Sequence, residues 1–176
     1  MPRQAIRNEG EPAEREFLRL VTGARRSTSA RLGDAVVPVD GQDSFVEVKC
    51  VTSNTINQIR AIKFIPLAIY SPDKPLPWAV LSGVDVVRHV FEKERGQHSE
   101  LALECANLSV SGLPNSVRCS ESALSDAVIE AIRRGRRYPE LAEVLQSLLR
   151  DLTELKTRYR ELVSAALNTG DRRDEA

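Results

Sequence analysis

Apolar side chains recur along the chain with two different periods, which predict an alternation of helices and short strands. From Glu11 to Thr22 charged residues alternate with apolar ones, and Phe17 and Val21 stand four residues apart, as on one face of a helix. Pro12 suits the first turn of a helix, and Gly23 is a common type of stop. We therefore expect a helix over residues 11–22.

Two β-branched runs follow, at Ala35–Val39 and at Ser44–Val51. Between them lies Asp40-Gly41, a pair typical of a two-residue hairpin turn. Pro38 has no N–H to donate to a neighbouring strand, so the first strand should lie at a sheet edge or carry a bulge. The pattern predicts an antiparallel two-stranded hairpin.

The middle of the chain alternates further helices and strands. Ser53 or Asn54 can cap a helix that runs to Lys63, and Pro66 ends it. The next segments predict strands at 67–70 and 78–82, a helix over 83–95 with Val84, Val87, Val90 and Phe91 facing inward, and a strand or irregular segment at 101–110.

The last third of the chain is helical. From Ser122 onward the pattern predicts two helical stretches, which are separated near Gly135 and Pro139. The composition of residues 169–176 predicts a disordered tail. We divide the chain into a core over 1–120, C-terminal helices over 121–168 and this tail. The order of elements predicts an α/β fold, in which a mixed sheet is flanked by helices and a long C-terminal helical extension follows.

The final helix carries one apolar stripe whose members are separated by alternating steps of four and three residues, the heptad spacing of a coiled coil. The members are Leu141, Leu145, Leu148, Leu152, Leu155, Tyr159, Leu162 and Ala166. This stripe predicts a homodimer. The alternative is that the helix folds back on its own domain, which Leu149 and Val163 favour because they widen the stripe.

Composition limits the classes of protein to consider. With 176 residues, 41% of them hydrophobic, the chain suits one domain of ordinary size. Lys plus Arg and Asp plus Glu both number 25, so any attraction to a charged partner must come from local clusters. Three cysteines without a C-x-x-C pair argue against a disulfide framework or structural zinc. Because no signal peptide or long apolar run is present, we expect a cytoplasmic protein with no membrane segment.

Candidate chemistry lies in the second strand of the hairpin. Successive side chains of a strand point to opposite faces, so Glu47 and Lys49 share one face while Val46 and Val48 pack on the other. Asp34, at the start of the preceding strand, can converge with the first pair. Carboxylates suit a hard cation such as Mg²⁺, and a nearby ammonium can orient a water or offset developing negative charge. This arrangement predicts hydrolysis of a phosphodiester.

Two other acidic residues are rivals to Asp34 as a metal ligand. Asp40 and Asp43 both lie at the turn of the hairpin, where Asp is favoured because it bonds to the local backbone. We therefore prefer Asp34.

The spacing Asp34, then Glu47-Val48-Lys49, resembles the motif of the PD-(D/E)xK nuclease superfamily, with Gly33 in place of the usual proline. The resemblance implies a restriction-endonuclease-like core that cuts DNA with Mg²⁺, for which Mn²⁺ can substitute. It also implies that Asp34 and Glu47 hold the metal while Lys49 assists the attacking water. The resemblance covers roughly residues 11 to 70.

The segment Ala13-Glu14-Arg15-Glu16 resembles the first helix of archaeal Holliday junction resolvases and their relatives, in which the first Glu helps to hold metal. This implies a metal-binding and catalytic role for Glu14. Glu16 is its rival, since only the orientation of the helix separates the two. Ser27 and Ser29 occupy the loop between helix and catalytic strand, where the resemblance implies contact with phosphate.

Further candidates follow the Glu-x-Lys triplet. A polar residue after the triplet often assists the site in this superfamily, which points to Gln58, with Arg60 and Lys63 facing the DNA backbone. The alternative is a solvated helix face. A basic cluster near the end of a later helix predicts phosphate contact or stabilisation of the helix dipole; its members are Arg133, Arg134, Arg136 and Arg137.

The leading hypothesis is a magnesium-dependent DNA endonuclease, a homodimeric restriction-type enzyme that cuts duplex DNA. The first alternative is a Holliday junction resolvase or repair nuclease, which the neutral net charge disfavours because a junction is clasped through backbone charge. The second is a DNA-binding protein that has kept the fold without activity. The intact set of Asp34, Glu47 and Lys49 speaks against that alternative.

Overall fold

The computed structural model describes residues 11–29, 31–91, 93, 96 and 101–170, and for residues 11 and 165–170 it describes the backbone alone. The helices are α1 (Glu11–Leu20), α2 (Gly83–Phe91), α3 (Leu124–Arg136) and α4 (Pro139–Gly170). The strands are β1 (Arg25–Arg26), β2 (Ala35–Val39), β3 (Gln42–Cys50), β4 (Thr55–Ile59), β5 (Leu67–Tyr70), β6 (Trp78–Leu81), β7 (Ala106–Ser109) and β8 (Arg118–Cys119). Short 3-10 helices are η1 (Ala61–Lys63), η2 (Asn115–Val117) and η3 (Glu121–Ala123).

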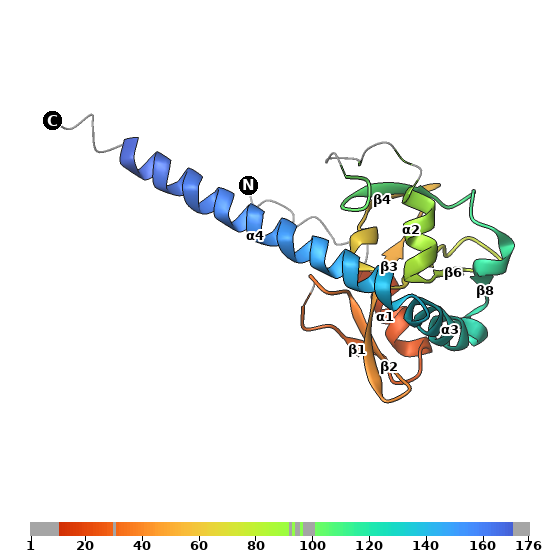
Figure 1. Ribbon diagram of the computed structural model, residues 1–176. Helices are drawn as coiled ribbons and strands as arrows, with labels where there is room; N and C mark the ends of the chain where they lie inside the picture. Colours follow the sequence, from red (N-terminus) through yellow and green to blue (C-terminus); the bar gives the residue numbers. More distant parts are fainter. Residues whose placement is uncertain (1–10, 30, 92, 94–95, 97–100, 171–176) are drawn as a thin grey trace.

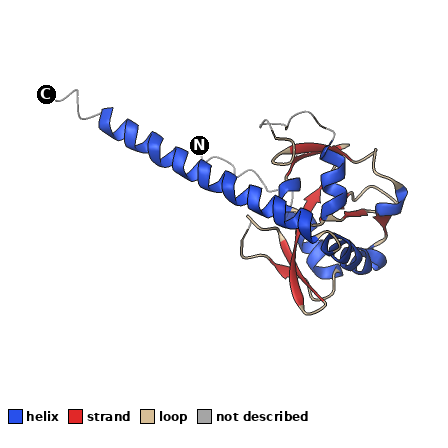
Figure 2. Ribbon diagram, viewed as in Figure 1, coloured by secondary structure: helices blue, strands red, loops and turns tan. Residues whose placement is uncertain are grey.

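The main sheet has six strands in the order β1-β2-β3-β5-β6-β8. Strands β3 and β5 run parallel, and the other neighbouring pairs of this sheet are antiparallel. Helices lie on both faces of the sheet (Figures 1 and 2). The predicted class, an α/β fold with a mixed sheet flanked by helices and a long C-terminal helix, is therefore confirmed.

The hairpin of β2 and β3 forms as predicted. Asp40 and Gly41 have φ angles of 52° and 76°, the left-handed conformation that a tight hairpin turn of this kind requires. Pro38 pairs with Asp43 of β3, while β1 pairs with β2 only at Ala35 and Val36. The proline therefore lies where β2 has no neighbour on its other side, as the missing N–H requires.

Alternation along the strands divides the core between the two faces of the sheet. On one face Val46 and Val48 of β3 pack with Phe17 of α1 and with Leu124 and Val128 of α3. On the other face the core is made by β5 and β6 with α2, η1 and the separate two-stranded sheet of β4 and β7. Glu47 and Lys49 belong to this second face because they alternate with the two valines.

The helix predicted from Ser53 or Asn54 to Lys63 is wrong. Residues 55–59 form β4, which pairs antiparallel with β7, and only the three residues of η1 are helical. The register shifts between Ile56 and Ile59, where Gln58 has a φ of 59°. This irregularity lets both isoleucines reach the core, with exposed fractions of 4% and 3%. Pairing with β7, about fifty residues away in the sequence, stabilises the β-branched residues of this segment more than a local helix would.

Helix α2 ends at Phe91, and its inward face includes the predicted Val84 and Val90, which are buried, and Val87, which is partly buried against the core. Val84, Val86 and Val90 are buried, whereas Phe91 is 77% exposed. Val86 and Val90 stand four residues apart and form one row against the core that includes β4 and β7. Phe91 is one position further around the helix, so the prediction that it faces inward is wrong.

The C-terminal helices separate where Gly135 and Pro139 predicted, with α3 ending at Arg136 and α4 beginning at Pro139. The first half of α4 packs against η1 and buries Leu145, which is 4% exposed. Lys156 forms an ion pair with Glu104, in the segment before β7. Beyond this point α4 extends away from the rest of the molecule (Figure 1).

The predicted stripe of α4 is thus divided into two parts. Leu141, Leu148 and Leu152 are half-buried against the domain, as the folded-back alternative predicts. Leu155, Tyr159 and Leu162 are 63%, 68% and 62% exposed. The distal half of the stripe therefore lacks a partner in the described part of this chain. None of the helices in the described ranges has the length and apolar character needed to cross a membrane.

Candidate active site

Asp34 lies where β3 changes its neighbour. Residues of β3 up to Val46 pair with β2, and from Glu47 onward they pair with β5. The backbone N–H of Asp34 donates to Val46 O over 3.0 Å, and its carboxylate Oδ2 accepts from the Val48 N–H over 2.9 Å. The carboxylate is therefore fixed beside the part of β3 that carries Glu47 and Lys49.

Two ammonium groups bracket the carboxylate of Glu47. Lys49 Nζ lies 2.8 Å from one carboxylate oxygen and Lys63 Nζ lies 2.8 Å from the other. Lys49 comes from the same strand face, as predicted, whereas Lys63 reaches the site from η1. The Lys63 side chain is 7% exposed, against 31% for Lys49. Lys63 is thus held inside the site by Glu47, a position that the sequence did not predict, since it placed this lysine on a helix facing the DNA backbone.

These contacts shift the pKa values of the three predicted residues. Burial, together with the charge of Glu47, raises the pKa of the Asp34 carboxyl above its usual value. Burial acts in the same direction on Glu47, but Lys49 and Lys63 outweigh it and its pKa is lowered. Burial alone would lower the pKa of Lys49, but Glu47, Asp34 and Glu14 raise it. Lys49 is therefore a cation at neutral pH, able to stabilise negative charge but not to take up a proton.

The donor set fits a magnesium ion in its chemistry. Asp34 and Glu47 offer hard carboxylate oxygens, and a bound ion would share the Glu47 oxygens with the ammonium groups of Lys49 and Lys63. Among the described residues, no group of three or more His, Cys, Asp or Glu side chains is placed to hold a metal ion. Mg²⁺ commonly binds through one or two carboxylates and keeps several waters, so this pair is sufficient for it.

The two candidate glutamates of α1 have different surroundings. Glu14 lies 3.7 Å from Arg26 of β1, and its charge contributes to the raised pKa of Lys49. Glu16 forms an ion pair with Arg19, one turn along the same helix. The orientation of α1 thus brings Glu14 toward the site, although it does not group this residue with Asp34 and Glu47 as metal ligands.

The loop before β2 is tied to the site through its backbone. The N–H of Ser27 donates to Asp34 O over 3.0 Å, and the Ser27 hydroxyl donates to Ser29 O over 3.0 Å. The N–H of Ser29 donates back to the Ser27 hydroxyl over 3.1 Å. These bonds shape the loop that precedes Asp34, and the contact of Ser27 and Ser29 with phosphate stays a prediction.

Gln58 and Arg60 lie on or just after β4 and are exposed. The irregular strand that carries Gln58 replaces the helix from which its assisting role was predicted.

Three of the four arginines of the basic cluster connect α3 to other elements, and the fourth, Arg137, pairs with a residue of α3 itself. Arg133 pairs with Asp40 over 2.7 Å, Arg134 pairs with Asp85 over 3.0 Å, and Arg137 pairs with Glu130 over 3.1 Å. Arg136 donates to Val39 O over 3.1 Å and to the Ser44 hydroxyl over 2.9 Å. These contacts give the cluster a structural role at the β2–β3 hairpin and at α2, and its contact with phosphate stays a prediction.

The rivals of Asp34 are engaged elsewhere. Asp40 accepts from Arg133, and Asp43 pairs with Arg25 over 2.5 Å. Both interactions lie around the hairpin turn.

The chain matches no protein-family model, no curated protein and no solved structure. The argument for a function therefore rests on the geometry of the site.

Replacing Asp34 by Asn is expected to leave the free energy of unfolding at neutral pH unchanged or to raise it. Because the pKa of Asp34 is raised on folding, the folded state holds this proton more tightly than the unfolded state. The stability that this residue contributes is therefore present below the unfolded pKa of about 3.9 and is lost as the pH rises through the folded pKa. An Asn side chain keeps an acceptor for the Val48 N–H and does not ionise.

Urea unfolding of both proteins in EDTA, at several values between about pH 4 and pH 8, measures the difference. The chelator is needed because a cation bound to Asp34 would reverse the effect. The wild type should lose stability relative to Asp34→Asn as the pH rises. A variant that is less stable by more than about 1 kcal/mol at neutral pH would show that the carboxylate has a net stabilising role.

Proposed function

We propose that this protein is a magnesium-dependent DNA endonuclease with a restriction-endonuclease-like core. The observation that carries the proposal is the convergence of Asp34 with Glu47 and Lys49. The Asp34 carboxylate accepts from the backbone N–H of Val48, which lies between the other two residues in the sequence. Two carboxylates and an ammonium gathered at one point of a sheet suit hydrolysis of a phosphodiester.

Asp34 and Glu47 would hold Mg²⁺, and Mn²⁺ offers a similar preference for oxygen ligands. The bound ion would polarise the phosphate and lower the pKa of a water bound to it. Lys49 keeps its proton and lies beside Glu47, where its charge can orient the attacking water and stabilise negative charge on the phosphate. The water oxygen would form a bond to phosphorus as the bond to one sugar oxygen breaks. The proton of the water would pass to solvent, and the departing sugar oxygen would take up a proton from solvent.

A homodimeric restriction-type enzyme is the form of this function that we favour. Its support is the distal stripe of α4, with Leu155, Tyr159 and Leu162 exposed along one helix. Pairing of two copies would set two sites at a fixed separation, so that each copy cuts one strand of a two-fold symmetric target. Double-strand cleavage would then follow from the symmetry.

A resolvase or repair nuclease is the second candidate, and the position of Glu14 favours it. The charge of Glu14 acts on Lys49, and α1 packs against β3 as the resemblance to resolvases leads one to expect. A third candidate is an inactive DNA-binding protein of the same fold. The preserved ion pair of Glu47 with Lys49, next to Asp34, argues against it.

Incubation of the purified protein with plasmid and with a synthetic four-way junction tests the proposal, each with Mg²⁺ or with EDTA. Discrete plasmid fragments that appear only with Mg²⁺ indicate restriction-type cleavage. Selective cutting of the junction indicates a resolvase. Binding of DNA without cleavage of either substrate, with Mg²⁺ or Mn²⁺, would leave the inactive DNA-binding protein as the conclusion.

Glu14→Ala is expected to lower metal-dependent cleavage by about tenfold or more, and Glu16→Ala is expected to have little effect. Only the first residue contributes charge at Lys49, whereas the second is paired with Arg19 on an exposed helix face. Cleavage rates of the two variants across a Mg²⁺ titration measure the difference. Equal rates at every Mg²⁺ concentration would remove α1 from the site.

A further inference from the structure

A hollow of about 360 Å³ lies where the parallel strands β3 and β5 end. The segment that follows β3 lines it with Val51 and Thr52, and the turn that follows β5 lines it with Ser71 and Lys74. Ends of β7 and β8 complete the wall through Ser111 and Arg118. In open α/β sheets the crevice outside the carboxyl ends of parallel strands is the usual place for a ligand. Its volume falls within the ~300–1,000 Å³ range of small-molecule sites.

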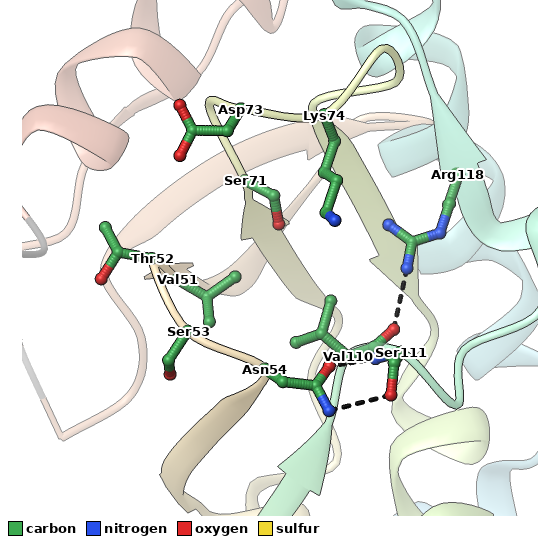
Figure 3. Close-up of a pocket in the computed structure, with 10 residues that line it drawn as sticks. All are labelled: Val51, Thr52, Ser53, Asn54, Ser71, Asp73, Lys74, Val110, Ser111 and Arg118. Carbon is green, nitrogen blue, oxygen red and sulfur yellow. Dashed lines mark hydrogen bonds between the residues drawn. The ribbon is translucent and has the colours of Figure 1, made fainter.

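The lining of this hollow combines apolar and polar surface and carries two cations. Figure 3 shows the ammonium of Lys74 and the guanidinium of Arg118 on the same side of the hollow, near the hydroxyl of Ser71. The carboxylate of Asp73, also in the lining, points away from both cations in this view. Within the described ranges neither cation is ion-paired with a carboxylate. The cations of the catalytic site, by contrast, are both held by Glu47.

Hydrogen bonds fix the walls of the hollow. Arg118 donates to Val110 O over 2.8 Å, which orients its guanidinium. Asn54 accepts from the Ser111 N–H over 2.7 Å and donates to the Ser111 hydroxyl over 2.8 Å. Ser71, which is 6% exposed, donates its N–H to Pro77 O over 2.7 Å. The guanidinium of Arg118 is thus held in place before a ligand binds, which reduces the conformational entropy lost on binding.

We propose that this hollow is a phosphate-binding site, in which Lys74 and Arg118 supply the charge and Ser71 supplies a hydroxyl. Guanidinium, ammonium and hydroxyl groups are the donors that phosphate oxygens favour. An apolar ligand would leave both cations and the Ser71 hydroxyl without a partner from the ligand. The assignment of a DNA backbone phosphate as the natural ligand rests on the proposed nuclease function. A free phosphate or nucleotide has the same chemistry.

The position of the hollow suits the DNA backbone. Val51 lies four residues beyond Glu47 on the same face of the chain, which corresponds to about 13 Å along an extended strand. This is roughly four base-pair steps of duplex DNA, since each strand carries a phosphate every 3.4 Å or so along the axis. A duplex that runs along β3 with its scissile phosphate at Glu47 would carry a further phosphate beside the hollow that Lys74 and Arg118 line.

The test uses the full chain in EDTA, so that DNA is bound but not cut. Binding of a short duplex is measured over a series of salt concentrations for the wild type, for Lys74→Gln and for Lys93→Gln. Lys93 is exposed and lies outside the hollow, so it controls for the loss of one positive charge. Lys74→Gln should weaken binding and reduce the slope of log Kd against log salt by about one, whichever sequence the duplex has. Lys93→Gln should leave the slope unchanged.

A second measurement identifies the source of the phosphate. Amide resonances of Ser71, Lys74 and Ser111 are followed by NMR during titration with inorganic phosphate and, separately, with the duplex, at constant ionic strength. Saturable shifts with both support a general phosphate site, and shifts with the duplex alone support a site for backbone phosphate. Absence of shifts in both titrations overturns the proposal, and an unchanged salt slope in Lys74→Gln overturns the assignment of DNA backbone phosphate as its ligand. Binding of phosphate in the hollow by a protein that cleaves no DNA would support this inference and refute the nuclease function. Cleavage of DNA by a protein whose hollow binds no phosphate would support the nuclease function and refute this inference.

Discussion

Lys49→Ala is expected to reduce DNA cleavage by about 10²–10³-fold while the protein stays folded, because removal of a preorganised group that stabilises transition-state charge commonly costs this much. Lys49 lies 2.8 Å from Glu47 and keeps its proton, so its charge is available where negative charge develops. Its side chain is 31% exposed, and Glu47 keeps Lys63 as a partner after the substitution. The loss should therefore fall on activity and not on folding.

The measurement is single-turnover cleavage of plasmid with saturating Mg²⁺, with thermal unfolding recorded for each protein. Asp43→Asn is a matched control, since it also removes one partner of an ion pair, on the exposed hairpin turn. The control should cut at the wild-type rate. If Lys49→Ala cuts within about threefold of the wild type, the assignment of this lysine is wrong, because a smaller effect does not need a charge at the transition state.

Glu47→Ala is a less clean test of the same site. It would leave the Lys63 ammonium, only 7% exposed, without the carboxylate that binds it. Removal of one partner of a buried ion pair costs about 3–5 kcal/mol, a large part of the stability of an ordinary domain. Loss of cleavage in this variant could then come from unfolding. The buried ion pair of Lys63 with Glu47 supports the structure of the site. The chemistry is therefore better tested by substitution of Lys49, which is more exposed.

The parts of the structure that the sequence could predict are those set by local signals. Asp40-Gly41 determines the hairpin turn, and strand alternation determines that Glu47 and Lys49 share a face. The placement of Asp34 follows from the register of the same hairpin, in which Ala35 pairs with Val46. The hairpin turn, the alternation along β3 and the register of the hairpin together place the candidate site without any contact from the rest of the fold.

The parts that could not be predicted depend on partners far away in the sequence. Residues 55–59 read as the start of a polar helix, but β4 forms because β7 lies beside it. Lys63 reaches the site from η1, directly after β4. Its position therefore depends on the formation of β4, and no pattern in the residues around it predicts this. The orientation of α1, which distinguishes Glu14 from Glu16, likewise depends on the burial of Ala13 and Phe17 against the sheet.

The second large effect is expected at the distal half of α4, where the substitutions Leu155→Asp and Leu162→Asp together should convert a dimer into a monomer. Both side chains are more than 60% exposed in the single chain, at 63% and 62%, and lie on the heptad stripe with Tyr159 between them. A charge at each of these two core positions of a short coiled coil should make the free energy of association less favourable by about 2 kcal/mol or more. The two losses together raise the Kd of the dimer roughly a thousandfold.

The dimer contact could also be tested by truncating the chain before Tyr138, which removes all of α4, but point substitutions are preferable. Leu145 of α4 is 4% exposed and the first half of the helix packs against η1, which carries Lys63 of the site. Removal of the whole helix would therefore disturb the site as well as the stripe. Val144→Asp is the matched control, because Val144 is 63% exposed on the same helix but lies outside the heptad positions.

Light scattering at micromolar concentration measures the mass, and a supercoiled plasmid reports the products of cleavage. The wild type and Val144→Asp should be dimers that linearise the plasmid, whereas the double variant should be a monomer that nicks one strand. A wild type that is already monomeric under these conditions, or a double variant that remains dimeric and still cuts both strands, would exclude the stripe as the dimer contact. A monomeric variant that nicks DNA would show that each copy carries a complete site and that α4 supplies only the pairing, because Asp34, Glu47 and Lys49 all come from one chain.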